Sequence, residues 1–172
     1  MNYLRDGDIR LRAVEPTDAE CVWEFETDST HWYSNGMMAP YSKKNIQDYA
    51  ENYDADPIRA GQLRMIVDYK DEIAGIIDLY DISPQNRTAF IGVYIKSSLR
   101  KQGLASRCLN LIENYASQLL NLRIVAAKIS EDNNPSKGLF LKSGYIKEAE
   151  FNNWLLRGKD KKSLLIYTKK LI

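Results

Sequence analysis

The feature that most constrains this chain is the segment 90–120, where an apolar strand pattern leads through a short loop into an amphipathic helix pattern. The loop reads RKQGLA at positions 100–105. The first amides of a helix have no partner within the helix, and the helix dipole adds positive charge there. Gly103 lets the backbone approach a bound group closely, while Arg100 and Lys101 supply positive charge. The segment therefore predicts a binding site for an anion such as a phosphate.

The spacing of this loop separates it from the best-known phosphate loops. The chain contains neither G-x-x-x-x-G-K-[ST] nor G-x-G-x-x-G. It does contain the pattern R/Q-x-x-G-x-G/A. A six-residue pattern with three fixed positions is weak evidence by itself. The pattern gains weight here because it follows an apolar strand and opens a helix, as anion binding requires.

Hydrophobic periodicity predicts the remaining elements and one α+β domain covering residues 1–172. Three consecutive strands joined by short polar turns form a meander, and a strand–helix–strand–helix pattern with two closing strands surrounds it. We expect a mixed, mostly antiparallel central sheet of about seven strands with helices on both faces. The expected strands are 9–14, 63–69, 73–82, 89–95, 123–129, 145–151 and 163–168, and the expected helices begin near 15, 42, 105 and 134. Asn134 is the expected cap of the last helix, before Pro135.

Composition excludes several classes of protein. Hydrophobic residues make up 44% of the 172 and the net charge is +1, so intrinsic disorder is not expected. No apolar run is long enough for a membrane span, and the N-terminus lacks the apolar core of a secretory signal. We therefore expect a cytoplasmic protein without membrane association. Two cysteines, Cys21 and Cys108, and one histidine predict no metal site and no disulfide framework.

Charge is distributed unevenly along the chain. Residues 1–60 contain 6 Lys and Arg against 12 Asp and Glu, whereas residues 61–172 contain 18 against 11. The chain lacks the basic stripe of a nucleic-acid binder, so no nucleic-acid partner is expected. An acidic part next to a basic part suits two ligands of opposite charge, although solvated surfaces can also segregate in this way.

The chain resembles the GNAT superfamily of acyl-CoA-dependent N-acetyltransferases over nearly its whole length, and three segments carry most of this resemblance. IGVYIKSSLRKQGLASRCLNLIENYA (91–116) looks like the family's fourth strand, pyrophosphate loop and third helix. KISEDNNPSKGLFLKSGYIKEAEF (128–151) looks like its later strand, the Asn-initiated helix and the turn into the next strand. RMIVDYKDEIAGIIDLYDI (64–82) looks like its second and third strands, with the frequent glycine at Gly75. The opening IRLRAVEPTDAECVWEF is similar to the branch of ribosomal-protein and spermidine acetyltransferases.

The resemblance implies how acetyl-CoA, the acyl donor, is bound. The backbone of β-strand residues would pair with the pantetheine arm, and loop amides and basic side chains would hold the pyrophosphate. The amide near Tyr94 would also polarise the thioester carbonyl, so Tyr94 is a catalytic candidate. Asn134 matches an asparagine that often contacts the cofactor, or it serves only as a helix cap. The implied cofactor-binding residues are Val93, Tyr94, Ile95, Arg100, Lys101, Gln102, Gly103, Leu104, Ala105, Ser106 and Asn134.

One position departs from the family pattern. Family members often have a tyrosine that protonates the leaving thiolate four residues before the glycine of the turn, and Phe140 stands there in this chain. A thiol of pKa ~8.5 still leaves tolerably as thiolate, so chemistry is not excluded. Tyr145, Ser143 and Tyr94 are the alternatives for a general acid.

The acceptor amine must lose a proton before it attacks, usually to a carboxylate. Asp78 and Asp81 are catalytic candidates because both lie in the otherwise apolar strand GIIDLYDI. Alternation places Asp78 on a face with Ile76 and Tyr80, and Asp81 on the other face with Ile77 and Leu79. Solvent-facing positions are the alternative for both, and Glu26, Asp28 and His31 are the next candidates for the base.

The acceptor site is expected near Glu26, His31, Trp32 and Tyr33. The segment with Trp32, Tyr33, Met37 and Tyr41 forms either an aromatic wall for a cationic amine or a plain packed loop. The sequence thus predicts acetyl transfer from acetyl-CoA to a primary amine by direct attack in a ternary complex. The acceptor is a protein N-terminus or lysine, a polyamine or another small amine. The alternative is a non-catalytic CoA-binding or protein-interaction module, and a hydroxyl acceptor is a third reading. A homodimer is compatible with the sequence.

Overall fold

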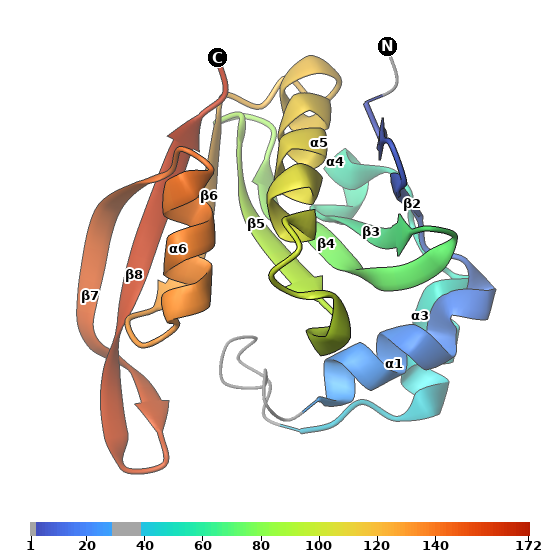
Figure 1. Ribbon diagram of the computed structural model, residues 1–172, viewed down its shortest axis with the longest axis horizontal. Coiled ribbons are helices and arrows are strands. Elements are labelled where there is room, and N and C mark those ends of the chain that lie inside the picture. The colour runs from blue at the N-terminus through green and yellow to red at the C-terminus, as the bar shows by residue number, and fades with distance from the viewer. Residues whose placement is uncertain (1–2, 29–38) are drawn as a thin grey trace.

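The computed structural model describes residues 3–28 and 39–172, and its centre is an eight-stranded sheet with the strand order β1-β2-β3-β4-β5-β6-β8-β7 (Figure 1). All neighbouring pairs are antiparallel except β5 and β6, so the mixed, mostly antiparallel sheet is confirmed. The expectation of about seven strands missed one, the two-residue edge strand β1. The strands are β1 (Arg5–Asp6), β2 (Ile9–Ala13), β3 (Leu63–Tyr69), β4 (Glu72–Ser83), β5 (Thr88–Ile95), β6 (Ile124–Ser130), β7 (Ile146–Arg157) and β8 (Asp160–Lys170).

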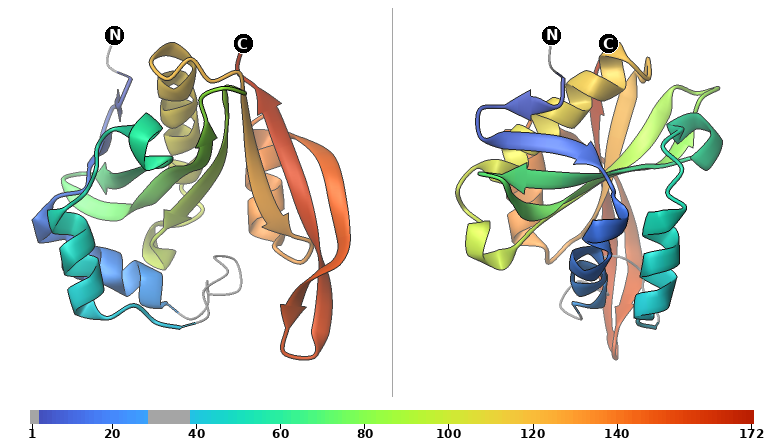
Figure 2. Two further views of the ribbon diagram at one scale, coloured as in Figure 1. Left: turned by 180° about the vertical axis from the view of Figure 1, so that it is seen from behind. Right: turned by 90° about the vertical axis from the view of Figure 1, so that its right-hand side faces the viewer.

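Helices cover both faces of the sheet, as the sequence predicts (Figure 2). Alternation along β3 shows why, because Ile66 belongs to one apolar cluster while Met65 and Val67 belong to the other. The cluster around Ile66 is closed by α1 (Ala19–Thr27) and α3 (Lys43–Glu51), and we call this side of the sheet the α1/α3 face. The larger cluster is closed by α5 (Leu104–Gln118) and α6 (Asn134–Lys142) on the α5/α6 face.

Several boundaries differ from the sequence expectation for physical reasons. Helix α6 is capped by Asn133, whose side chain accepts from the Ser136 amide at 3.2 Å, so Asn134 is not the cap. Asn134 is instead the first helical residue and is exposed. The short helix α4 (Pro57–Ala60) was not anticipated and is capped by Asp56. Strands β7 and β8 extend well beyond their predicted ends into a hairpin that projects from the sheet (Figure 1).

A buried ion pair attaches the start of α1 to the sheet. Arg12 on β2 donates to both carboxylate oxygens of Asp18, at 2.7 and 2.9 Å, and to Asp68 on β3 at 2.8 Å. Asp18 is only 3% exposed, and it precedes α1 directly. The pair therefore fixes where α1 begins over the α1/α3 face. No helix within residues 3–28 and 39–172 has the length and apolar character needed to cross a membrane.

Candidate functional site

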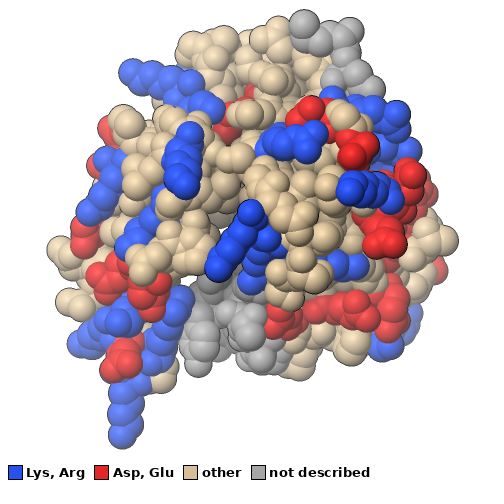
Figure 3. Space-filling model, viewed as in Figure 1, with Lys and Arg blue, Asp and Glu red and all other residues tan. Residues whose placement is uncertain are grey.

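An opening in the centre of the sheet is the structural basis of the site. Strands β5 and β6 pair only from Thr88 to Phe90 with residues 124–126. β5 continues to Ile95, and β6 continues to residue 130 while pairing only with β8. The two strands diverge from this point in Figure 1, and Figure 3 shows the surface hollowed there, with Lys and Arg side chains beside the hollow. One edge of β5 beyond Phe90 is therefore available to a ligand.

The backbone partners predicted for the pantetheine lie in this unpaired stretch. Val93, Tyr94 and Ile95 follow the last β5–β6 pair, and their other edge is paired with β4. Residues 92–94 are all half-buried, as expected for the floor of an open slot. The structure thus places these three residues at the unpaired edge of β5.

Gly75 on β4 permits an unusually close approach of the β5 backbone. A Cβ atom at this position would lie 2.0 Å from the carbonyl oxygen of Tyr94. Gly75 pairs with Ile95 in the register of the two strands. A side chain cannot fit there, so this glycine fixes the course of β5 beside the opening.

The loop after β5 places helix amides at the end of the opening. Lys101 and Gly103 both have positive φ, 62° and 79°, so the chain turns sharply into α5. The first helical hydrogen bond of α5 runs from the Arg107 amide to the Gly103 carbonyl oxygen, at 3.2 Å. The amides of residues 104–106 come before this bond in the chain and point out of the helix N-terminus. The Leu104 side chain is 2% exposed and anchors this first turn in the core. The arrangement fits a pyrophosphate, because it offers backbone donors, the helix dipole and no side chain at position 103.

Arg100 lies closer to β5 than the sequence suggested. Its Nε donates to the Ile95 carbonyl oxygen at 2.8 Å, and its guanidinium carbon lies 5.5 Å from the centre of the Tyr94 ring. Both contacted residues belong to the unpaired stretch. Arg100 therefore supports the opening itself, in addition to carrying charge near the loop.

The position of the missing family tyrosine is buried. Phe140 is 4% exposed and packs edge-to-face on Tyr145, with 4.8 Å between ring centres. The Tyr145 hydroxyl donates to Glu113 at 2.8 Å, and burial together with the Glu113 charge raises the pKa of Tyr145. Tyr145 is thus committed to the core and is a poor substitute as general acid. Ser143, another alternative, lies with its Oγ 3.5 Å from that of Ser106.

The Tyr94 side chain packs against the end of α1. Its ring packs on Phe25 of α1, with 4.9 Å between ring centres, and its hydroxyl lies 3.5 Å from the carboxylate of Asp28. Burial, followed by the Asp28 charge, raises the pKa of Tyr94. The hydroxyl therefore keeps its proton at neutral pH and can donate it.

A charged cluster on the α1/α3 face was only partly anticipated. Arg64 on β3 donates to both oxygens of Asp78 at 2.8 and 2.9 Å, and its Nη1 lies 2.6 Å from Glu26. The charges of Asp78 and Glu26 raise the pKa of Arg64 well above its usual value, against the opposing effect of burial. The three side chains are 10–23% exposed and together bear a net charge of −1. Both carboxylates were among the residues predicted from the sequence, and Arg64 was missed, although a charged residue at the start of the apolar run in LRMIVDY was a usable signal.

Two tyrosines of the helical layer surround this cluster. Tyr53 accepts the Arg64 amide at 2.9 Å and donates to the Arg64 carbonyl at 2.7 Å. Tyr49 places its ring 5.9 Å from the Arg64 guanidinium. The Tyr49 hydroxyl is buried without a hydrogen-bond partner among the described residues, and burial raises the pKa of Tyr49 to about 12. The Tyr49 hydroxyl therefore keeps its proton at neutral pH and finds no hydrogen-bond acceptor among the described residues.

Asp81 does not share a face with Ile77 and Leu79, and that expectation is wrong. A bulge gives Asp81 a φ of 49°, so alternation breaks and Ile82 takes the buried position. The Asp81 side chain is 63% exposed and pairs with Lys128 of β6 at 3.3 Å. Asp78 does lie on the same face as Ile76 and Tyr80, as predicted, because the register there is regular.

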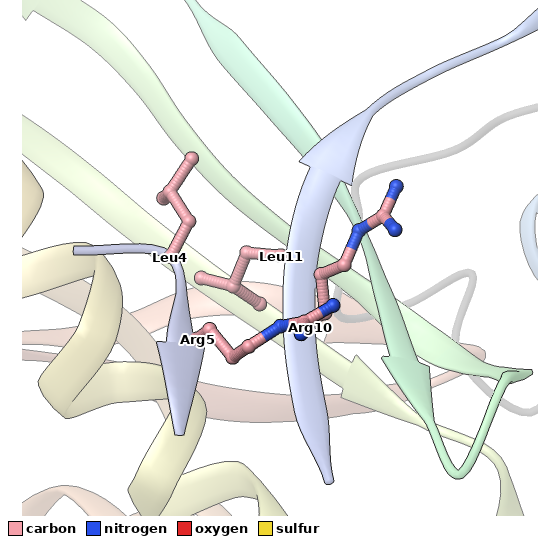
Figure 4. Close-up of a pocket in the computed structure, with 4 residues that line it drawn as sticks. All are labelled: Leu4, Arg5, Arg10 and Leu11. Carbon is pink, nitrogen blue, oxygen red and sulfur yellow. The ribbon is translucent and has the colours of Figure 1, made fainter. Parts of the chain in front are cut away.

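The remaining predicted acceptor residues, His31, Trp32 and Tyr33, lie outside the described residues. Glu26 is described and belongs to the Arg64 cluster. A separate pocket at the far edge of the sheet, lined by Leu4, Arg5, Arg10 and Leu11, contains none of the predicted site residues (Figure 4).

The open β5 edge and the helix N-terminus at its end could hold an extended ligand that carries a phosphate, and the sequence comparisons identify the class of enzyme. The sequence matches the family described as Acetyltransferase (GNAT) domain over residues 8–146, and the chain belongs to this family. It is an acetyl-CoA-dependent N-acetyltransferase, with acetyl-CoA as the acyl donor.

Two curated relatives come from Escherichia coli K12. The ribosomal-protein-serine acetyltransferase is 26% identical over 153 residues, covering 84% of this chain and 86% of the relative. The spermidine N(1)-acetyltransferase is 23% identical over 145 residues, covering 83% and 75%. Both are similar in sequence over most of their length.

Solved structures confirm the fold. The ribosomal alpha-N-protein acetyltransferase RimL in complex with coenzyme A superposes with a TM-score of 0.82 at 18% identity, over 96% of this chain and 95% of that one. The spermidine N-acetyltransferase from Vibrio cholerae, in complex with CoA and spermine, also gives 0.82 at 18% identity, over 96% and 97%.

Proposed function

We propose that acetyl-CoA lies in the β5–β6 opening with its pyrophosphate at the N-terminus of α5. The observation that carries this proposal is the continuity of the unpaired β5 edge with the loop around Gly103. The amides of residues 102–106 hold the pyrophosphate, with Arg100 and Lys101 supplying countercharge. Val93, Tyr94 and Ile95 pair with the pantetheine as an added strand would.

The acetyl group then lies beside Tyr94. The bound donor supplies an activated acyl carbon, and the amine nitrogen forms a bond to this carbon while the carbon–sulfur bond breaks. The backbone amide near Tyr94 polarises the carbonyl oxygen. The Tyr94 phenol gives a proton to the departing sulfur, since Phe140 has none to give and Tyr145 is bound to Glu113.

A carboxylate on the α1/α3 face takes the proton that the amine loses. Asp78 is our first candidate, acting through water, because Arg64 already occupies both of its oxygens. Asp28, beside the Tyr94 hydroxyl, is the second. Glu26 adds negative charge that favours a cationic amine. Asp81, exposed and paired with Lys128, ranks last as a base.

The relatives suggest which amines to test. One is named for a ribosomal-protein serine and another for spermidine, so a protein N-terminus and a polyamine are both acceptor candidates. We also propose that the chain forms one domain, acts in the cytoplasm and assembles as a homodimer. A dodecameric spermidine N-acetyltransferase from Vibrio cholerae supports self-association, and β7 leaves one sheet edge unpaired among the described strands.

A thiol-release assay with acetyl-CoA and a panel of amines tests the reaction, with calorimetry to measure donor binding separately. Asp78→Asn, assayed with the best amine, is expected to lose more activity at pH 7 than at pH 9. At the higher pH a larger share of an amine of pKa ~10 is already neutral, so it needs less help from a base. Equal loss at both pH values would show that Asp78 is structural, and Asp28→Asn is then the variant to assay.

A further inference from the structure

The two faces of the sheet differ sharply around β6 and β8. On the α5/α6 face, Val125, Ala127 and Ile129 are at most 3% exposed. On the opposite face, Ala126 is half-buried and Lys128 is exposed. No described helix packs on this second area, which continues the α1/α3 face beyond the Arg64 cluster. It is on the face of the sheet opposite the one that α5 covers.

Strand register places opposite charges in one row across this face. Asp78 of β4 pairs with Gly92 of β5, and Phe90 pairs with Ala126. Lys128 is two residues beyond Ala126, so it lies level with Gly92 on the far side of the opening. At the level of the backbone, the row therefore consists of Asp78, Gly92, the opening and Lys128. Asp78 and Gly92 are paired neighbours, roughly 4.8 Å apart at the backbone, whereas Lys128 lies farther than this from Gly92 because β5 and β6 no longer pair at this level.

Nothing within the described residues requires a glycine at position 92. Its φ is not positive, and an added Cβ would meet only the edge of the Tyr80 ring at 3.8 Å, an ordinary contact. By contrast, Gly75 has no room for a Cβ at all. Gly92 itself therefore adds no side chain to the space between the two charges, which the edge of the Tyr80 ring borders.

Lys128 is held in place and still accessible. Its Nζ lies 4.1 Å from the centre of the Phe90 ring and 5.4 Å from that of Tyr80. Its described ionic partner, Asp81, is an exposed side chain at 3.3 Å, and exposed pairs of this kind contribute little. A ligand carboxylate can therefore replace Asp81 at small cost, while the two aromatic rings hold the ammonium over the Tyr80–Phe90 pair, which is next to the Asp78–Gly92 pair on the same face.

We propose that the acceptor is an amine with a carboxylate a few ångströms from its amino nitrogen, read by Lys128, and not a polyamine. This rests on the proposed function. The net negative Glu26–Arg64–Asp78 cluster attracts the amino group on one side of Gly92, and Lys128 binds the carboxylate on the other. A polyamine would satisfy the first contact and place a second cation against Lys128. A free amino acid and an acidic peptide N-terminus share the required chemistry.

Initial rates of thiol release with matched acceptors test this. The acceptors are alanine, alaninamide, alanyl-aspartate amide, alanyl-asparagine amide and spermidine. The wild type is expected to prefer each carboxylate to its amide by roughly tenfold to a hundredfold in kcat/KM, the value of one charge-assisted hydrogen bond. This preference opposes intrinsic reactivity, because alaninamide is the more deprotonated amine. If alanine has a higher kcat/KM than alanyl-aspartate amide, the acceptor is a free amino acid. If the order is reversed, the acceptor is an acidic peptide N-terminus.

Variants assign the preference to Lys128. Lys128→Gln is expected to reduce the acid-to-amide ratio to near one, mainly through KM, and Lys128→Glu to favour spermidine. Lys161→Gln, an exposed lysine on the projecting hairpin, is the matched control and keeps the wild-type ratio. Spermidine or alaninamide as the best wild-type acceptor, or a ratio that Lys128→Gln leaves unchanged, overturns this proposal alone. Bound acetyl-CoA with no turnover of any amine overturns the proposed function, and this inference with it.

Discussion

The two sides of the β5–β6 opening to which we assign the donor and the acceptor, called the donor side and the acceptor side, are built in different ways. The donor side is one continuous segment, from Val93 to Ser106, and it offers mainly backbone groups to the ligand. The acceptor side collects side chains from four separate elements, with Glu26, Arg64 and Asp78 on one part and Lys128 on another. Backbone donors suit a ligand that every family member shares. Side chains from distant elements can change one at a time, which suits a ligand that differs between members.

The largest expected effect comes from the glycine that connects the two sides. Gly75→Ala would place a Cβ 2.0 Å from the Tyr94 carbonyl, so β4 and β5 must separate. We expect the free energy of unfolding to fall by about 2–4 kcal/mol, with loss of acetyl-CoA binding in the folded fraction. Urea unfolding and calorimetry measure both effects.

Gly138→Ala is the matched control for that substitution. Nothing lies within 4 Å of an added Cβ there, and α6 continues through this residue. Alanine should stabilise this helix by roughly 0.5–1 kcal/mol. If Gly75→Ala behaved like Gly138→Ala, the close approach of β4 to the Tyr94 carbonyl would be wrong.

Breaking the ion cluster should damage the acceptor side alone. Arg64→Leu leaves Asp78 and Glu26 without their shared partner, and we expect a loss of about 2–3 kcal/mol in stability. The KM for the amine should rise while acetyl-CoA affinity stays close to that of the wild type. Arg59→Leu removes an exposed partner of Asp54 and should change neither quantity much. A matching loss of donor affinity in Arg64→Leu would contradict the separation of the two sides.

Changing Gly103 should damage the donor side alone. A β-branched residue is strained at a φ of 79°, so Gly103→Val should weaken acetyl-CoA binding by roughly tenfold or more and remove its thermal stabilisation. Gly103→Asn tolerates that φ better and should lose less. The KM for the amine is the control and should hardly move. Wild-type affinity in both variants would sink the assignment of the pyrophosphate loop.

The smallest expected effect belongs to Phe140. Phe140→Tyr adds a hydroxyl at a side chain that is 4% exposed, so we expect a modest loss of stability. If the new hydroxyl reaches the opening, kcat rises by at most about tenfold, below the usual range for acid catalysis. Tyr94→Phe is the comparison variant and should lower kcat. A rise in kcat with Phe140→Tyr and no loss with Tyr94→Phe would move the general acid away from Tyr94.

The same contrast explains what could be predicted from the sequence. The sheet type, both helical layers and the loop around Gly103 were predictable, because local periodicity and a contiguous pattern encode them. Lys128 and Arg64 were missed because only strand register brings them level with residues far away in sequence. The wrong face for Asp81 arose from a bulge that alternation cannot reveal. The helix cap was predicted one residue too late, at Asn134 and not at Asn133, because two adjacent asparagines precede Pro135.

Amide hydrogen exchange with and without coenzyme A tests whether backbone groups of the unpaired β5 edge and the α5 N-terminus hold the donor. We expect slower exchange in peptides covering 91–95 and 102–107 when coenzyme A is bound, with peptides covering 9–13 and 63–69 unchanged because β2 and β3 lie away from the opening. Binding of coenzyme A without protection of either 91–95 or 102–107 would contradict this assignment.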